Sequence, residues 1–168
     1  YNKLKGLNVA CLRYFNAVGY DMLGRVKKVE KNPTNLLPIV MEVATGKRDR
    51  VEVYGNDYDT KDGTCIRDYI HVNDLATAHV NTIKSFPNNS KIIINLATGN
   101  SYSVLDVINK AQEISNKKIN FHFTNRRIGD IDSIFSKSNL AEKVIGWKCK
   151  YSDLDIILES MLKIYRTN

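Results

Sequence analysis

The sequence predicts an α/β protein, because short apolar runs typical of strands alternate with segments whose apolar residues recur at helical spacing. Residues 9–12 and 92–96 are apolar runs, which is the pattern of strands in a parallel sheet that is covered on both faces. Polar residues follow the first run at Arg13 and Asn16, where a parallel strand delivers side chains into a crevice at its carboxyl end. No internal repeat or linker is visible, so we expect one α/β unit.

The first half of the chain predicts three extended segments and one helix. We expect strands at residues 9–12 and 51–54, with a further short extended run at 68–72 after the turn-rich residues 55–64. A long loop through Thr34 separates the first strand from a helix that Asn35 can cap and Gly46 can end. The apolar face predicted for this helix consists of Leu36, Val40, Val43 and Ala44.

The second half predicts three helices and two strands. Asn73 is expected to cap a helix whose apolar face is Ala76, Val80 and Ile83. Strands are expected at residues 92–96 and 119–123. Ser103 and Asp106 have the Ser-x-x-Asp spacing that begins a helix, with inward residues at Val104, Val107, Ile108, Ala111 and Ile114. Ser152 and Asp155 open the last helix, whose inward residues are Leu154, Ile157, Leu158, Met161, Leu162 and Tyr165.

Charge and composition favour a soluble cytoplasmic protein over a nucleic-acid-binding or membrane protein. Six of the seven net positive charges lie within residues 1–50, and only Arg25, Lys27, Lys28 and Lys31 form a short basic run. That run has no interleaved aromatic residue and no nucleic-acid-binding signature, so we expect a solvated loop. No apolar run approaches the ~20 residues that cross a bilayer. The three cysteines have no metal-ligand spacing, as expected in a reducing compartment.

Motifs for catalysis are absent from the sequence, so we expect no catalytic residue and no metal site in this chain. There is no Gly-x-x-Gly-x-x-Gly turn after an opening strand and no helical Tyr-x-x-x-Lys pair of the kind that supplies an activated acid/base tyrosine. The three histidines are scattered, and none is paired with cysteine or carboxylate at ligand spacing. We therefore interpret each histidine as structural.

Two segments carry a resemblance to a known family. Residues 12–19, Leu-Arg-Tyr-Phe-Asn-Ala-Val-Gly, resemble the Arg-Tyr-Phe-Asn-Pro-Val-Gly segment of extended short-chain dehydrogenases that act on nucleotide sugars. Residues 51–72 resemble the corresponding segment of the UDP-galactose (UDP-glucose) 4-epimerases, including the seven-residue loop 58–64, which is usually shorter in related dehydratases and decarboxylases. Further matches follow in the family's order at residues 35–38, 46–48, 95–99 and 126–130.

The resemblance implies a role for individual residues. Tyr14 and Phe15 would pass beside the nicotinamide of NAD, and Asn16 would hydrogen-bond the substrate. The remaining implied roles belong to the UDP-sugar: Asn35 and Leu36 at a helix N-terminus, Arg67 and Arg127 on the diphosphate, Val53, Tyr54 and Val104 near uracil, and Asp130 on the ribose. Without the resemblance, Val53 and Val104 would be core residues, Asp130 a turn residue, and the arginines surface charges.

Departures from the family pattern affect three places. Ala17 replaces the usual proline, Ile128 replaces a glutamate, and residues 21–33 are basic where an acidic pattern is common. Ile134 falls at the family's sugar gate, which is bulky in enzymes restricted to glucose and galactose and small where N-acetyl sugars also fit. Isoleucine is intermediate in size, so the sequence leaves the acceptance of N-acetylated UDP-sugars open.

The resemblance also implies how this chain relates to a whole enzyme. In the family the first matching segment lies about halfway along the polypeptide. We therefore expect residues 1–19 to finish a parallel Rossmann-type, NAD-binding domain and residues 20–168 to form mainly the smaller substrate-binding region. The whole enzyme would be a homodimer that interconverts UDP-galactose and UDP-glucose through a 4-keto intermediate, and this chain alone would be inactive. The alternatives are another nucleotide-sugar enzyme (a dehydratase or a UDP-N-acetylhexosamine epimerase) or a non-catalytic nucleotide-sugar-binding module.

Overall fold

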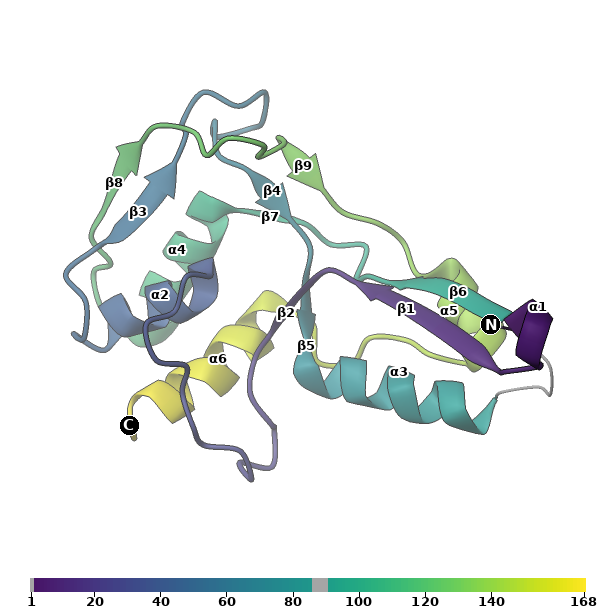
Figure 1. Ribbon diagram of the computed structural model, residues 1–168. Helices are drawn as coiled ribbons and strands as arrows, with labels where there is room; N and C mark the ends of the chain where they lie inside the picture. Colours follow the sequence, from purple (N-terminus) through teal and green to yellow (C-terminus); the bar gives the residue numbers. More distant parts are fainter. Residues whose placement is uncertain (1, 86–90) are drawn as a thin grey trace.

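The computed structural model describes residues 2–85 and 91–168, which form two packed groups of strands and helices (Figure 1). In the first group, β1 (Val9–Tyr14) pairs in parallel with β6 (Lys91–Leu96). Helices α3 (Val72–Lys84) and α5 (Asn139–Ile145) accompany this pair, and the short α1 (Asn2–Lys5) precedes it. The core of this group is formed by Ile70, Leu75, Ala78, Ile92, Ile94, Leu96, Ala141, Ile145 and Trp147. The two predicted apolar runs are thus confirmed as parallel strands.

The second group contains the other parallel pair, β3 (Val51–Tyr54) and β8 (Phe121–Thr124). Three helices pack together beneath it: α2 (Leu36–Ala44), α4 (Val104–Ser115) and α6 (Leu154–Tyr165). All six inward residues predicted for α6 are buried in the core of this group. Alternate residues of β3 divide between two faces, since Val51 and Val53 are buried whereas Glu52 is exposed.

Among the described residues, five strands of two or three residues lie between the two groups (Figure 1). Strand β2 (Asn16–Val18) pairs in parallel with β5 (Tyr69–His71). Strand β4 (Ile66–Arg67) lies between β7 (Tyr102–Ser103), which is antiparallel to it, and β9 (Ser133–Ile134), which is parallel. These strands bring residues from distant parts of the sequence to one place, and the candidate site forms there.

Helix α4 begins as its sequence predicts. The Ser103 hydroxyl accepts a hydrogen bond from the Asp106 N–H at 3.0 Å, and the Asp106 carboxylate accepts one from the Ser103 N–H at 2.9 Å. This reciprocal capping box satisfies two of the N–H groups that a helix start leaves unpaired. Helix α6 differs slightly, because its cap is Asp153 and the neighbouring Ser152 is buried against Asp74 instead.

The predicted inward face of α3 is wrong. The helix starts at Val72, with His71 as its cap, and Val80 and Ile83 are 48% and 76% exposed. The buried face includes Asp74 and Thr82, two polar residues whose hydrogen bonds are satisfied inside the protein. Apolar periodicity fails here because a buried polar group with partners can occupy an inward position.

Strand β8 is shorter and more exposed than its alternating pattern predicts. Ile119 is buried but precedes the strand, whereas Phe121 and Phe123 are exposed and contact each other edge to face. Strand β8 has only one described neighbour, β3, so these rings lie at a sheet edge. In the described part of the chain, no helix is long and apolar enough to cross a membrane.

Candidate functional site

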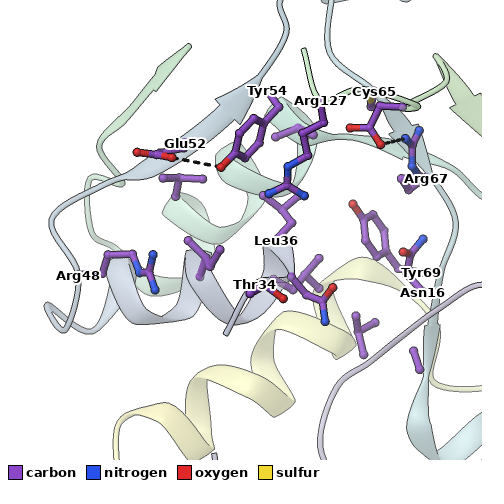
Figure 2. Close-up of a pocket in the computed structure, with 18 residues that line it drawn as sticks. Asn16, Thr34, Leu36, Arg48, Glu52, Tyr54, Cys65, Arg67, Tyr69 and Arg127 are labelled. Carbon is purple, nitrogen blue, oxygen red and sulfur yellow. Dashed lines mark hydrogen bonds and ion pairs between the residues drawn. The ribbon is translucent and has the colours of Figure 1, made fainter. Parts of the chain in front are cut away.

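A cavity of about 350 Å³ opens between the start of α2, strand β3 and the short strands around β4 (Figure 2). Its volume is within the range of small-molecule sites. Eight residues that the sequence nominates as substrate-binding line it: Asn16, Asn35, Leu36, Tyr54, Arg67, Val104, Arg127 and Asp130. The fold therefore brings together side chains that are up to 114 positions apart in the sequence (Asn16 to Asp130).

The other nominated residues lie outside the cavity wall. Val53 is only 1% exposed because its side chain points into the core, so only its backbone could contact a ligand there. Ile134 is partly exposed. It pairs with Arg67, which lines the cavity, in the register of β4 and β9. Tyr14 is the last residue of β1, and Phe15 comes directly after it. The Tyr14 ring is half exposed and contacts the ring of His79.

The start of α2 presents backbone donors to the cavity. Asn35 is the N-cap residue, but its side chain makes no capping hydrogen bond, and no acidic residue occupies the first turn. The first N–H groups of a helix have no partner within the helix, and the helix dipole adds partial positive charge there. Leu36 and Leu37 both line the cavity at this point. This end of α2 can therefore accept an anionic group.

Arg67 is held rigidly at one side of the cavity. One of its guanidinium nitrogens donates to the carbonyl oxygens of Ile66 and Ile131, each at 2.9 Å. The other lies 3.5 Å from the Asp130 carboxylate. A guanidinium fixed by main-chain acceptors keeps its remaining donors in a defined direction, which suits recognition of phosphate oxygens.

Arg127 is positioned differently. Its guanidinium carbon lies 3.8 Å from the centroid of the Tyr54 ring, in a cation–π contact. Within residues 2–85 and 91–168, no side chain or carbonyl accepts a hydrogen bond from Arg127. Its donors are therefore free to bind a ligand in the cavity.

The adjacent Arg126 has no such freedom. It donates to the Asp57 carboxylate at 2.7 Å and to the Asp57 carbonyl at 2.6 Å, and it stacks on Tyr58. This contact holds the pKa of the Asp57 carboxyl below its ordinary value. Of the two neighbouring arginines, one fixes a loop and the other faces the cavity.

Asn16 lies on the Arg67 side of the cavity, paired with Tyr69 in the register of β2 and β5 (Figure 2). Its side-chain amide donates to the Asp68 carbonyl at 2.8 Å. The Asp68 carboxylate is buried and accepts hydrogen bonds from the Thr98 N–H and hydroxyl. Burial raises the pKa of Asp68 above its ordinary value. These bonds connect the segments at residues 12–19, 66–72 and 95–99, all of which carry the family resemblance.

Several cavity residues are not found by the sequence reasoning. The wall also contains Ala17, Val18, Thr34, Leu37, Ile39, Arg48, Val51, Glu52, Cys65 and Tyr69. The period-two alternation of β3 could have indicated Glu52, which shares a face with Tyr54. Tyr69 is buried, and burial raises the pKa of its hydroxyl. Among the described residues, no group of three or more His, Cys, Asp or Glu could hold a metal ion.

Comparison with known proteins agrees with this geometry and defines the class. Residues 1–97 match the NAD dependent epimerase/dehydratase family, so the chain belongs to that family. It is 41% identical to the UDP-glucose 4-epimerase of Halalkalibacterium halodurans over 155 residues, covering 92% of this chain and 46% of that protein. It is 43% identical to the enzyme of the same name from Bacillus subtilis over 145 residues, covering 85% and 43%.

A solved structure also matches this chain in fold. The UDP-glucose 4-epimerase from Bifidobacterium longum, in complex with NAD+ and UDP, matches with a TM-score of 0.93 and 39% identity. That match covers 99% of this chain and 50% of the solved chain. The resemblance to 4-epimerases and the α/β fold are therefore confirmed. The chain spans about half the length of the curated relatives it matches.

Proposed function

We propose that this chain binds the nucleotide part of a UDP-sugar and belongs to a UDP-glucose 4-epimerase. The whole enzyme would interconvert UDP-galactose and UDP-glucose through a 4-keto intermediate. The observation that carries this proposal is the uncommitted guanidinium of Arg127, which shares a cavity with Arg67 and the open N-terminus of α2. The two guanidinium groups and the helix N-terminus supply positive charge around one cavity. This charge complements the two negative charges of a nucleoside diphosphate bridge.

Each wall of the cavity then has a role in holding the ligand. Arg67, Arg127 and the start of α2 at Asn35 and Leu36 bind the diphosphate. Asp130, already oriented by Arg67, accepts hydrogen bonds from the ribose hydroxyls. Tyr54 and Val104, with the backbone of Val53, form the apolar surface for the base. Firm binding of the nucleotide leaves the hexose free to turn between two orientations.

The remaining nominated residues face the reacting end. Asn16 hydrogen-bonds the sugar, and Ile134 limits the space around it. Tyr14 and Phe15 provide one edge of the NAD site, since they leave β1 at its carboxyl end, where ligands bind in α/β sheets. NAD supplies the hydride acceptor when it is bound. This chain contributes position and nucleotide affinity, so on its own it converts no UDP-galactose. The whole enzyme is proposed to be a cytoplasmic homodimer.

The domain division also belongs to this proposal. Residues 1–19 would complete the NAD-binding domain, and residues 20–168 would form mainly the nucleotide-sugar-binding region. Strand β1 supports this assignment, because only β6 pairs with it in the described part of the chain and Cys11 on it is exposed. Its other edge is open to a further strand of a larger parallel sheet.

Calorimetric titration of this chain with UDP tests the nucleotide part of the proposal. UDP should bind, and Arg127→Ala should weaken binding about tenfold to a hundredfold, since a charge-assisted hydrogen bond contributes ~1.5–3 kcal/mol. Arg25→Ala is the matched control, because Arg25 pairs with Asp21 on a loop and does not line the cavity. Equal binding by both variants, or no binding at all, would contradict the proposal.

Product analysis with the whole protein tests the reaction. UDP-galactose should be converted to UDP-glucose in the presence of NAD. Release of a stable 4-keto-6-deoxy sugar would instead identify a dehydratase. Conversion by this 168-residue chain alone would refute the proposed dependence on the rest of the enzyme.

A further inference from the structure

Cys65 places a thiol on the wall of the cavity, and the proposed function gives this thiol no role. Alternate residues of the segment 65–69 line the cavity, namely Cys65, Arg67 and Tyr69, because successive side chains of extended backbone point to opposite faces. Figure 2 shows Cys65 beside Arg67, on the side of the cavity away from Glu52. Cys65 is only 6% exposed, so a reagent reaches its sulfur by entering the cavity.

A buried hydroxyl next to this thiol has unused hydrogen-bonding capacity. Tyr58 is only 4% exposed, and its hydroxyl has no hydrogen-bond partner among the described residues. Burial raises the pKa of Tyr58 to about 12, and the neighbouring Cys65 thiol adds to this shift, so the hydroxyl keeps its proton at neutral pH. An unpaired buried donor is costly. The Tyr58 hydroxyl can therefore donate to an acceptor atom on a group attached to Cys65.

The other two cysteines lie outside the cavity wall and provide internal references. Cys11 is exposed on β1, so its access does not depend on the cavity. Burial raises the pKa of the Cys149 thiol to about 11. Because the thiolate is the form that attacks a disulfide, Cys149 reacts slowly at neutral pH.

The charge of the cavity favours an anionic reagent. Arg67 and Arg127 both line it, and they attract a small disulfide that carries carboxylates more than a cationic disulfide of similar size. In the exchange, the Cys65 thiolate attacks one sulfur of the reagent. A new S–S bond forms as the reagent's own S–S bond breaks, so the Cys65 sulfur is oxidised and the released sulfur is reduced. The released thiolate takes up a proton, which balances the one that Cys65 lost.

We propose that Cys65 is a modification site that bound nucleotide protects. In the empty cavity it forms a mixed disulfide with a small anionic disulfide, and the attached group then occupies the space of the UDP moiety. This inference rests on the proposed function, because UDP is the ligand that competes with the modification. It goes beyond that function by coupling nucleotide binding to the thiol–disulfide state of the surroundings.

Two disulfides of similar size test the modification: dithiodiglycolate, with two carboxylates, and cystamine, with two ammonium groups. Each is reacted with the 168-residue chain with and without UDP, and mass spectrometry of peptides measures the rate at each cysteine. The preference for dithiodiglycolate should be larger at Cys65 than at Cys11. Saturating UDP should slow the reaction of Cys65 about tenfold or more and leave that of Cys11 within about twofold, since only the free chain exposes Cys65.

Calorimetry with UDP tests the consequence for binding. The chain that carries the mixed disulfide should bind UDP at least about tenfold more weakly, because the attached group and the nucleotide exclude each other, and dithiothreitol should restore the affinity. In Cys65→Ser, treatment with dithiodiglycolate should no longer change the affinity for UDP. The matched variant Cys11→Ser should keep the sensitivity of the unchanged chain.

The results separate this inference from the proposed function. If UDP binds but neither protects Cys65 nor is weakened by its modification, the assignment of Cys65 is wrong while the proposed nucleotide site stands. If UDP does not bind the untreated chain, the proposed function fails and this inference fails with it.

Discussion

The guanidinium of Arg127 rests on the ring of Tyr54 at 3.8 Å, and this contact joins the two halves of the proposed nucleotide site. In the proposed function, Tyr54 is both a wall for the base and a platform for the arginine that would bind phosphate. Arg126 makes the analogous contact with Tyr58 at 4.0 Å, but there the arginine is also bound to Asp57. The two stacked pairs therefore differ in whether the arginine is available to a ligand.

Loss of the Tyr54 ring should weaken nucleotide binding. Tyr54→Leu removes the platform, and an exposed cation–π contact contributes ~0.5–1 kcal/mol, so UDP affinity should fall about two- to fivefold. Tyr54→Phe keeps the ring and should stay within about twofold of the unchanged chain. Calorimetry with UDP measures both. A leucine variant that binds as tightly as the phenylalanine variant would show that Arg127 needs no platform.

Gly19 cannot accept a side chain. Its φ of +86° lies in the left-handed region, and a Cβ there would lie 2.5 Å from the His71 ring. Gly19→Ala should lower the free energy of unfolding by about 2 kcal/mol or more, from backbone strain and overpacking together. Urea denaturation measures this change.

Gly24 provides the matched control for Gly19. Its φ is +67°, but a Cβ there would meet nothing within 4 Å. Gly24→Ala should therefore cost only the backbone term, about 1 kcal/mol. Equal losses in the two variants would mean that the His71 ring moves aside without cost.

Most of the regular elements could be predicted from the sequence, because their patterns are local. The apolar runs of β1 and β6, the capping box of α4 and the inward stripe of α6 each depend on neighbouring residues. The face of α3 could not be predicted in this way. Its inward Asp74 is stabilised by groups more than 70 positions away, which no local window contains.

The candidate site shows the same limit. The family resemblance nominates Arg67, Arg127 and Asp130, and the structure places all three on one cavity. Without the resemblance, the local sequence does not distinguish Arg126 from Arg127, because their contacts depend on Asp57 and Tyr54 in other segments. Two-residue strands such as β4, β7 and β9 carry no periodic signal, although they bring the site together. The proposed ligand roles of these residues remain predictions.

His71 should make stability depend on pH. The ring is buried, its Nδ1 accepts the Asn73 N–H at 3.0 Å, and Nε2 lies 3.3 Å from the Ser160 hydroxyl. Burial lowers the pKa of His71 below its ordinary value of 6.5. The folded state therefore binds fewer protons than the unfolded state below that pH, and stability is lost as the pH falls from about 6.5 toward the lowered pKa.

Urea denaturation at pH values from about 7.5 down to about 5 tests this dependence. His71 can contribute at most ~1.4 kcal/mol per pH unit. His71→Gln should flatten the slope, whereas His79→Gln, on the exposed side of α3, should leave it unchanged. A slope that persists in His71→Gln would assign the pH dependence to other groups.

Substitution of Asp74 should lower the free energy of unfolding more than substitution of any other polar residue outside the cavity. Its hydrogen bonds connect α3 to the segment that precedes α6. Its carboxylate accepts hydrogen bonds from the Lys150 and Tyr151 N–H groups, each at 2.9 Å, and from the Ser152 hydroxyl at 2.6 Å. Asparagine has the same shape but one acceptor oxygen, so Asp74→Asn turns an N–H group toward another N–H group. Each lost charge-assisted bond is worth ~1.5–3 kcal/mol, so the variant should lose at least about 2 kcal/mol in urea denaturation. Asp155→Asn, which alters an exposed carboxylate paired with Lys110, should lose far less. Similar losses in the two variants would mean that residues 150–152 dock without Asp74, and that the apolar contacts of Trp147 and Leu154 hold this segment instead.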